Sequence, residues 1–219
     1  MFVDIHTHLD NQSVIKIVDG DEVRILRTEG IHPWELDRHF ECSEAKSRNL
    51  LRLRGVDFST SVEMTRLFAI GEVGLDKVHK ETFDKQVEVF EEMIRLSETY
   101  RKPMIIHCVR AYSEIIEMRK KTKATMPWVI HGFNSSVETM RQLLRYDMYI
   151  SLGEVLYHNE NQAVEILKDV PFDRLFLETD VSGRDIKDVY NKAANLMGCE
   201  DEFLCKQIFE NYGRLEAAH

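Results

Sequence analysis

The sequence has no long apolar run and only four cysteines, and these two shortages narrow the class of protein considerably. No apolar stretch approaches the roughly 18 residues of a membrane-spanning helix, so we expect no membrane partner. The N-terminus lacks a basic region followed by an apolar stretch, so no secretory signal is expected. The cysteines form no C-x-x-C pair, which favours reduced thiols in a cytoplasmic protein. They are Cys42, Cys108, Cys199 and Cys205.

The sequence also lacks an excess of positive charge. It has 29 basic and 38 acidic residues and a formal net charge of −9, which argues against a protein that coats nucleic acid. A local phosphate site is still compatible with this charge, because bound divalent ions reverse the local sign. The length of 219 residues and the hydrophobic content of 43% suit one domain, residues 1–219. We find no internal repeat, no low-complexity linker and no sign of an obligate protein partner.

The first eight residues predict a strand that ends in two histidines. Side chains at alternate positions of a strand share a face, so His6 and His8 project together, above Asp4. Two such imidazoles lie about 7 Å apart along the strand and can converge on one metal ion. An isolated pair of this kind is more often two surface histidines, so the rest of the chain has to decide between the two interpretations.

Two β-rich runs follow, at 14–18 and 23–28, with the turn signal Asp19-Gly20-Asp21 between them. A parallel crossover needs a dozen or more residues, so this short connection predicts a hairpin or an irregular turn. Residues 35–66 are polar and give weaker signals, with a candidate helix at 41–50 and a short strand or turn at 51–56.

From residue 68 onward, strands and helices alternate, which is typical of a parallel sheet. We expect strands at 68–73, 104–108, 128–131, 148–156 and 175–180, and helices at 82–100, 112–121, 135–146, 161–168, 185–197 and 200–211. The fold class predicted is α/β, a TIM-type (β/α) barrel that is abbreviated in its N-terminal strand–helix units.

Polar residues of metal-binding type recur where these strands end. In a barrel with its site at the carboxyl face, such residues converge. Imidazoles and carboxylates suit Zn²⁺, Mn²⁺ or a similar ion, and their number fits two ions about 3.5–4 Å apart. The predicted set is His6, His8, Glu72, His107, His131, Glu178 and Asp180. Any single histidine at a strand end is more often a hydrogen-bonded polar residue than a metal ligand. Glu178 and Asp180 could instead cap the helix that follows them.

The remaining histidines give no such pattern. His32 precedes Pro33 at a strand end and could orient a substrate or simply pack. Histidines 39, 79, 158 and 219 lie in loops or polar stretches, and we expect them at the surface. No serine elbow is found, so a serine nucleophile is not expected.

Six stretches of this sequence, spread over nearly the whole chain, form a set. They are His6-x-His8-Leu9-Asp10, Gly30-Ile31-His32-Pro33, Gly71-Glu72-Val73-Gly74-Leu75-Asp76, Ile106-His107, His131-x-Phe133 and Glu178-Thr179-Asp180. Together they resemble the TatD family of metal-dependent deoxyribonucleases. The Gly-Glu-x-Gly-Leu-Asp stretch is especially specific, with Gln86 and Phe90 adding support.

The resemblance implies a TIM-type barrel with two divalent ions (Zn²⁺, Mn²⁺ or Mg²⁺) that hydrolyses phosphodiesters, often at a DNA end. By that resemblance one ion is held by His6, His8 and Asp180. The other is held by His107 and His131, with Glu72 between the two. Asp180 is then the candidate to accept the proton of the attacking water, and Glu178 the candidate to orient a ligand.

Three departures from the family pattern concern the substrate side. The chain is short between His8 and Gly30. Val109 stands where the family places an arginine, and Arg110 follows one position later as our candidate for binding phosphate. Val181-Ser182-Gly183 replaces the usual Ala-Pro. Other functions therefore stay open: hydrolysis of a small phosphoester, lactone or amide, or a metal-binding scaffold without turnover. Retention of Asp180 and Glu72 argues against the scaffold.

Overall fold

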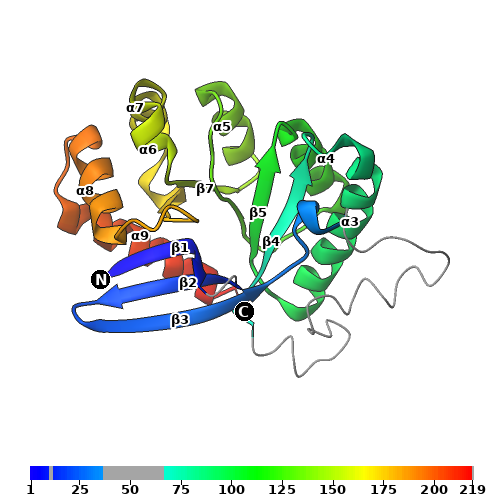
Figure 1. Cartoon of the computed structure of the whole chain (residues 1–219), viewed down its shortest axis with the longest axis horizontal. Coiled ribbons are helices and arrows are strands. Elements are labelled where there is room, and N and C mark those ends of the chain that lie inside the picture. The colour runs from blue at the N-terminus through cyan, green and yellow to red at the C-terminus, as the bar shows by residue number, and fades with distance from the viewer. Residues whose placement is uncertain (10–11, 37–66, 219) are drawn as a thin grey trace.

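A computed structural model describes residues 1–9, 12–36 and 67–218 of the chain, and its centre is one eight-stranded sheet in sequential order (Figure 1). β1 pairs antiparallel with β2, and β2 with β3, whereas each later pair from β3 to β8 is parallel. The strands are β1 Phe2–Leu9, β2 Gln12–Asp19, β3 Glu22–Glu29, β4 Ala69–Asp76, β5 Met104–Val109, β6 Trp128–Ile130, β7 Tyr149–Leu152 and β8 Leu175–Leu177.

The first and last strands meet and close the sheet into a barrel. Thr7 forms a parallel bridge with Asp180, just beyond the end of β8. The amide of Asp180 donates a hydrogen bond to the carbonyl of His6 at 3.0 Å. The predicted TIM-type barrel is therefore confirmed. The seam that closes it, between β1 and the segment after β8, joins two segments that hold candidate ligands.

The barrel was predicted to be abbreviated in its N-terminal strand–helix units, and the structure shows this at β2. β2 and β3 are joined by Gly20 and Asp21 alone, and Gly20 takes a φ of 62°, which favours glycine in a tight hairpin turn. No helix separates these strands, so β2 runs against the other seven. Of the two connections predicted for this stretch, a hairpin or an irregular turn, the structure has the hairpin.

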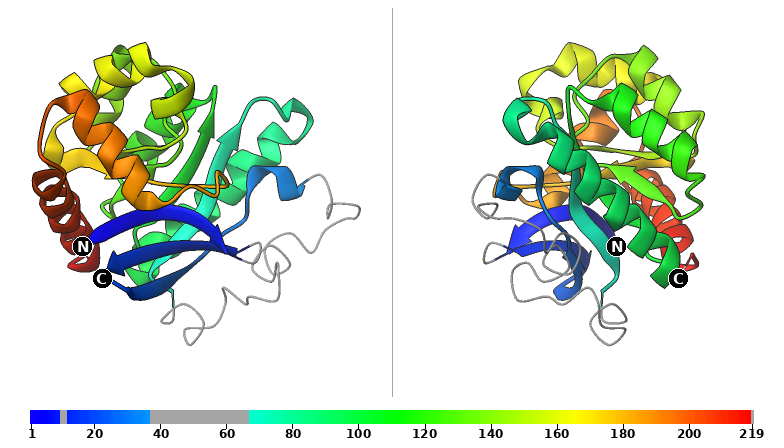
Figure 2. Two further views of the ribbon diagram at one scale, coloured as in Figure 1. Left: turned by 60° about the vertical axis from the view of Figure 1, so that its left-hand side comes forward. Right: turned by 90° about the vertical axis from the view of Figure 1, so that its right-hand side faces the viewer.

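Helices surround the parallel half of the barrel, as both views of Figure 2 show, and α8 and α9 pack against β1 and β8. Buried side chains join helices to strands: the rings of Phe90 in α3 and Trp128 in β6 pack with centroids 5.5 Å apart. The helices are η1 Pro33–Glu35, η3 Lys80–Thr82, α3 Phe83–Tyr100, α4 Tyr112–Thr122, α5 Val137–Leu144, α6 Val155–His158, α7 Glu160–Asp169, η4 Phe172–Arg174, α8 Ile186–Met197 and α9 Asp201–Glu216. In the part of the chain that the structure describes, no helix is both long and apolar enough to cross a membrane.

The structure changes two predicted elements. The strand expected at 148–156 ends at Leu152, because the chain bends at Gly153 and begins α6. A Cβ atom at Gly153 would lie 2.8 Å from the carbonyl oxygen of Glu178, so only glycine fits this bend. The strand expected at 175–180 ends at Leu177. The elements expected within 37–66 lie outside the described residues.

Candidate metal centre

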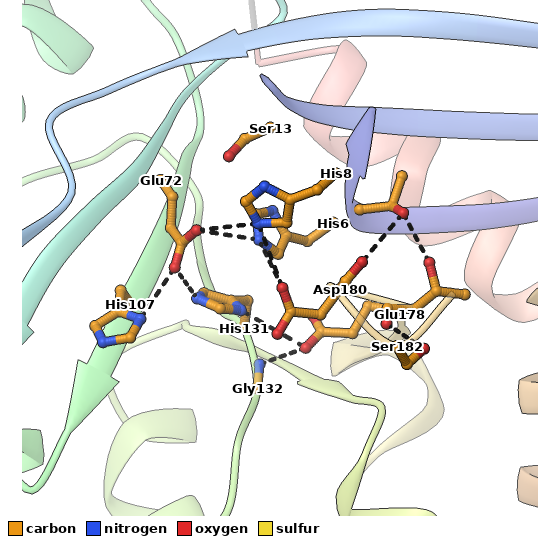
Figure 3. A network of polar contacts seen from close by, with 12 residues as sticks. His6, His8, Ser13, Glu72, His107, His131, Gly132, Glu178, Asp180 and Ser182 are labelled. Carbon is orange, nitrogen blue, oxygen red and sulfur yellow. Dashed lines mark hydrogen bonds and ion pairs between the residues drawn. The ribbon is translucent and has the colours of Figure 1, made fainter. Parts of the chain in front are cut away.

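The strand-end side chains singled out in the sequence come together at the carboxyl end of the barrel (Figure 3). Three overlapping groups have ligand atoms within 4.8 Å of one another, and each could hold a metal ion. The groups are His6, His8 and Asp180; His6, Glu72 and His131; and His32, Glu72 and His107. The six ligands that the family resemblance implies are all in these groups, His32 joins them as a seventh candidate, and Glu178 of the predicted set is in none of them.

Glu72 of β4 is the centre of this cluster, and its two oxygens face different histidines. Oε1 lies 2.7 Å from Nε2 of His131 and 3.0 Å from Nδ1 of His107. Oε2 lies 3.2 Å from Nε2 of His6 and 3.6 Å from Nε2 of His8. Burial opposes ionisation of Glu72, but the charge of His131 and the surrounding imidazole hydrogen bonds outweigh it, so its pKa lies well below the usual range.

Asp180 completes the side of the cluster that lies on the closing seam. Its Oδ1 atom is 3.5 Å from Nε2 of His6 and 3.4 Å from Nε2 of His8. Burial alone would raise the pKa of this carboxyl, yet the nearby imidazoles of His6 and His8 lower it, so Asp180 is ionised near neutral pH. The nearby carboxylates of Asp180 and Glu72 in turn raise the pKa of His8 to about 9.

Unsatisfied buried nitrogens support metal binding at this cluster. Both ring nitrogens of His6 and Nδ1 of His131 are buried without a hydrogen-bond partner among the described residues. Buried polar atoms of proteins are almost always paired, so such exceptions need a physical reason. Imidazole nitrogens and carboxylate oxygens are ligands that Zn²⁺ and Mn²⁺ accept, and the residues present therefore fit such ions.

Glu178 lies behind His131 rather than among the central carboxylates. Its Oε1 accepts a hydrogen bond from the amide of Gly132 at 2.6 Å and lies 3.6 Å from Nδ1 of His131. Its Oε2 accepts the hydroxyl hydrogen of Ser151 at 2.5 Å. Glu178 is buried, and its contacts are those of a group that orients an imidazole.

Asp76, for which we predicted no role, plays a comparable part on the opposite side. Its Oδ2 accepts a hydrogen bond from Nε1 of Trp34 at 2.6 Å and lies 3.4 Å from Nε2 of His107. The backbone amide of Asp76 donates to Oε1 of Gln86 at 2.7 Å, and Nε2 of Gln86 donates to the backbone carbonyl of Asp76 at 3.1 Å. Gln86, noted in the sequence only for its spacing, thus holds the end of β4 in place.

Asp4 was also without a predicted role, although it shares a strand face with His6. Its carboxylate accepts hydrogen bonds from both the amide and the hydroxyl of Thr179, the residue before Asp180. Burial, only partly offset by these hydrogen bonds, raises the pKa of Asp4 to about 7. The period-two pattern of β1 was the one sequence signal that pointed to this residue.

The two predicted substrate-binding residues lie in different surroundings. His32 is inside the cluster, with Nε2 3.1 Å from Oε1 of Glu72, and burial lowers its pKa. Arg110 is exposed in the turn between β5 and α4, with a φ of 56°. No hydrogen bond or ion pair joins Arg110 to the cluster in the ranges that the structure describes.

Of the histidines expected at the surface, two lie in the described chain. His158 is largely exposed and pairs with Glu154. His79 is half-buried, and its ring centroid lies 5.7 Å from that of Trp34. Histidines 39 and 219 are outside the described residues. The described cysteines, Cys108, Cys199 and Cys205, form no disulfide.

A barrel whose strand ends gather imidazoles and carboxylates around a central glutamate is suited to hold metal ions at its carboxyl face. The chain belongs to the TatD family, because the family's sequence model, described as TatD related DNase, matches residues 1–216.

Individual relatives agree with this assignment. YabD, an uncharacterized metal-dependent hydrolase of Bacillus subtilis, is 35% identical over 52% of this chain and 46% of its own length. The human 3'-5' RNA nuclease TATDN2 is 32% identical over 69% of this chain and 19% of its own length. The match thus spans about half or less of these two relatives. The solved structure of YjjV, a TatD homolog from Escherichia coli, has the same fold, with a TM-score of 0.70 at 20% identity over 87% of this chain and 76% of that one.

Proposed function

We propose that this protein hydrolyses phosphodiester bonds in DNA at a centre that holds two divalent ions. The observation that supports it is the division of Glu72, whose Oε1 faces His107 and His131 while Oε2 faces His6 and His8. A carboxylate divided in this way is suited to lie between two ions. One ion is assigned to His6, His8 and Asp180, and the other to His107 and His131.

Asp180 is the residue to which we assign proton transfer. When bound, two divalent ions activate a water and stabilise charge on the attacking and leaving oxygens of the displacement. The lowered pKa of the Asp180 carboxyl leaves it ionised near neutral pH, and therefore able to accept the proton of the attacking water.

The surrounding residues orient these groups. Glu178 receives hydrogen bonds from Gly132 and Ser151, which aim its Oε1 at Nδ1 of His131. A carboxylate behind a histidine ligand sets the ring's orientation and makes it a better ligand. His32 lies beside Glu72, with Nε2 3.1 Å from Oε1, and we assign it to orienting the substrate.

DNA is the proposed substrate because the family is described by DNase activity, and one relative, from Schizosaccharomyces pombe, bears the name Deoxyribonuclease Tat-D. That relative is 25% identical over 70% of this chain and 50% of its own length. TATDN2 bears the name of an RNA nuclease, so RNA belongs in the same test. The net charge of −9 agrees with a substrate that is held through bound cations rather than through a basic surface.

The test uses protein stripped with a chelator and reloaded with Mn²⁺, Zn²⁺ or Mg²⁺. End-labelled DNA and RNA oligonucleotides and a small aryl phosphodiester are offered side by side, with Asp180→Asn as the control for contaminating nucleases. We expect metal-dependent shortening of DNA that the variant lacks. Turnover of the aryl ester alone would indicate a small phosphoesterase. No turnover with any metal would indicate a metal-binding scaffold.

A further inference from the structure

Trp34 is an exposed aromatic side chain in direct contact with the metal centre. It belongs to η1, two residues after His32, and 53% of its surface is open to solvent. Its ring centroid lies 4.8 Å from that of His32 and 5.9 Å from that of His107. Isolated exposed aromatics are common on protein surfaces, but this one touches two candidate ligands.

The indole is held by its edge. Nε1 donates to Oδ2 of the buried Asp76 at 2.6 Å, and the backbone amide of Trp34 donates to Nδ1 of His32 at 3.2 Å. Asp76 is fixed in turn by the amide of Val78, which donates to its Oδ1 at 2.7 Å. The polar atom of the ring therefore points into the protein, while more than half of the side chain remains in solvent.

We infer that the indole of Trp34 is the surface on which a nucleobase stacks while the adjoining phosphodiester lies at the metal centre. The inference rests on the proposed function and adds a residue that recognises the base. Trp34 touches His32, and His32 Nε2 lies 3.1 Å from Glu72, so a base on the indole sits close to the reacting linkage. An aromatic face accepts any base, because every base has a π-face.

The charge of the chain makes such a contact useful. Proteins that bind nucleic acid through phosphates need a basic surface, and here the net charge is −9. Stacking needs no charge, so it adds affinity that changes little with salt. Stacking on an aromatic side chain is worth about tenfold or more in binding for each base.

A role limited to holding Asp76 is the competing explanation, and substitution separates the two. Trp34→Phe keeps an aromatic face but lacks the N–H that Asp76 accepts. Trp34→Ala lacks both. Phe203→Ala is the matched control, since Phe203 is 45% exposed on α9 and contacts Phe172, which precedes β8 and so lies toward the opposite end of the barrel.

The kinetic test compares oligonucleotides that carry a terminal base with others in which an abasic sugar replaces it, at either end in turn. For the wild type, we expect kcat/KM to fall about tenfold or more when the base at the end that is cleaved is removed. The quantity compared is the ratio of kcat/KM with the terminal base to kcat/KM without it. Trp34→Ala should bring this ratio close to one, whereas Trp34→Phe and Phe203→Ala should retain most of it. Loss of the Asp76 hydrogen bond alone would lower both values of kcat/KM alike and leave the ratio unchanged. An unchanged ratio in Trp34→Ala would overturn the inference while leaving the proposed hydrolysis intact.

Tryptophan fluorescence gives a second measurement that requires no turnover. The chain has two tryptophans, and Trp128 is fully buried, so quenching by a bound base reports on Trp34. With an oligonucleotide in which methylphosphonates replace the phosphodiesters, we expect quenching by the based form and not by the abasic form. Trp34→Phe should respond to neither. Equal quenching by both forms would overturn the stacking. Quenching by the based form alone, together with no hydrolysis of unmodified DNA in the kinetic test, would leave the stacking standing and contradict the proposed function.

Discussion

Asp4 and Thr179 are joined by two hydrogen bonds across the seam that closes the barrel. The amide of Thr179 donates to Oδ1 of Asp4 at 2.9 Å, and its hydroxyl donates to Oδ2 at 2.6 Å. Asp4 stands two residues before His6, and Thr179 stands one residue before Asp180. The pair therefore couples the strand that presents two candidate ligands to the segment that presents a third.

We predict that Asp4→Ala lowers both stability and activity. The buried amide of Thr179 loses its acceptor, which should reduce the free energy of unfolding by about 1–3 kcal/mol. The segment that holds Asp180 then loses its support, so kcat should also fall. Asp4→Asn should be milder, because its amide oxygen can still accept from the Thr179 amide. Urea unfolding and steady-state kinetics measure the two effects.

Tyr190→Phe is the matched control for this prediction. The hydroxyl of Tyr190 donates to the carbonyl of Val3 at 2.9 Å and accepts from its amide at 3.1 Å, so it also fixes β1 from the end of the chain. We expect a similar loss of stability with kcat unchanged. Equal losses of kcat in Tyr190→Phe and Asp4→Ala would mean that Asp4 acts through global stability alone.

Glu178→Gln should weaken metal binding without unfolding the protein. The variant keeps an oxygen for the amide of Gly132 but loses the negative charge beside Nδ1 of His131. Changes of this kind behind a histidine ligand commonly cost about 10–100-fold in metal affinity. Competition with a chelator of known affinity measures it. Ser151→Ala removes one hydrogen bond to Glu178 and keeps its charge, so it should lower metal affinity less than Glu178→Gln does. A larger loss of affinity in Ser151→Ala would mean that packing around Glu178, and not its charge, supports the metal.

Much of the metal centre could be predicted from the sequence because its ligands follow the periodicity of strands. The alternation in β1 placed His6 beside His8, and the strand-to-helix pattern after residue 68 placed Glu72 and His107 at neighbouring strand ends. These are local rules, since side-chain direction in a strand repeats every two residues. The hairpin at Gly20 was likewise a local signal.

Contacts between distant segments could not be predicted in this way. Trp34 and Asp76 are hydrogen-bonded although 42 positions separate them in the sequence, and Asp4 and Thr179 although 175 positions separate them. These residues come together only when the barrel closes. The buried face of α3 includes a polar residue, since the helix buries Gln86, Val89, Phe90, Met93, Ile94, Leu96 and Ser97. The polar Gln86 is buried because it binds the end of β4, a contact that hydrophobic periodicity does not register.

Metal content provides a direct test of the centre. Protein stripped and then reloaded with Zn²⁺ or Mn²⁺ should hold two ions per chain by elemental analysis, since the cluster divides around Glu72. Each site should also stabilise the fold, by about 2.7 kcal/mol when the free ion is at 100 times its dissociation constant. A rise in melting temperature on reloading measures this. At most one ion per chain, even in excess metal, would contradict the two-ion proposal.

Asp180→Asn should retain the fold and lose most activity. The amide is a poor ligand and cannot accept the proton of the attacking water, and groups in acid–base roles commonly contribute about 10²–10⁴-fold in rate. Asp185→Asn is the control, because Asp185 only caps α8, where its side chain accepts from the amide of Lys187 at 2.9 Å, and asparagine caps equally well. Near wild-type turnover in Asp180→Asn would assign the proton to another group.

Arg110→Ala tests whether the exposed arginine after β5 grips a flanking phosphate. A guanidinium can hold a phosphate through two parallel hydrogen bonds, and bonds to charged groups are worth about 1.5–3 kcal/mol, or roughly tenfold or more in binding. We therefore expect the KM for a DNA end to rise by about that factor. The KM for a small aryl phosphodiester should change little, because that substrate has no flanking phosphate.

Arg101→Ala is the matched control for Arg110→Ala. Both arginines are exposed and take left-handed backbone conformations, with φ of 53° and 56°, so alanine meets similar strain at each position. Arg101 precedes β5 and Arg110 follows it, so the two lie toward opposite ends of the barrel and only Arg110 is on the side of the metal centre. At one salt concentration, the ratio of the two KM values should change in Arg110→Ala alone, and the change should shrink as salt is added. Equal changes for both substrates, or equal changes in both variants, would remove Arg110 from the binding of DNA.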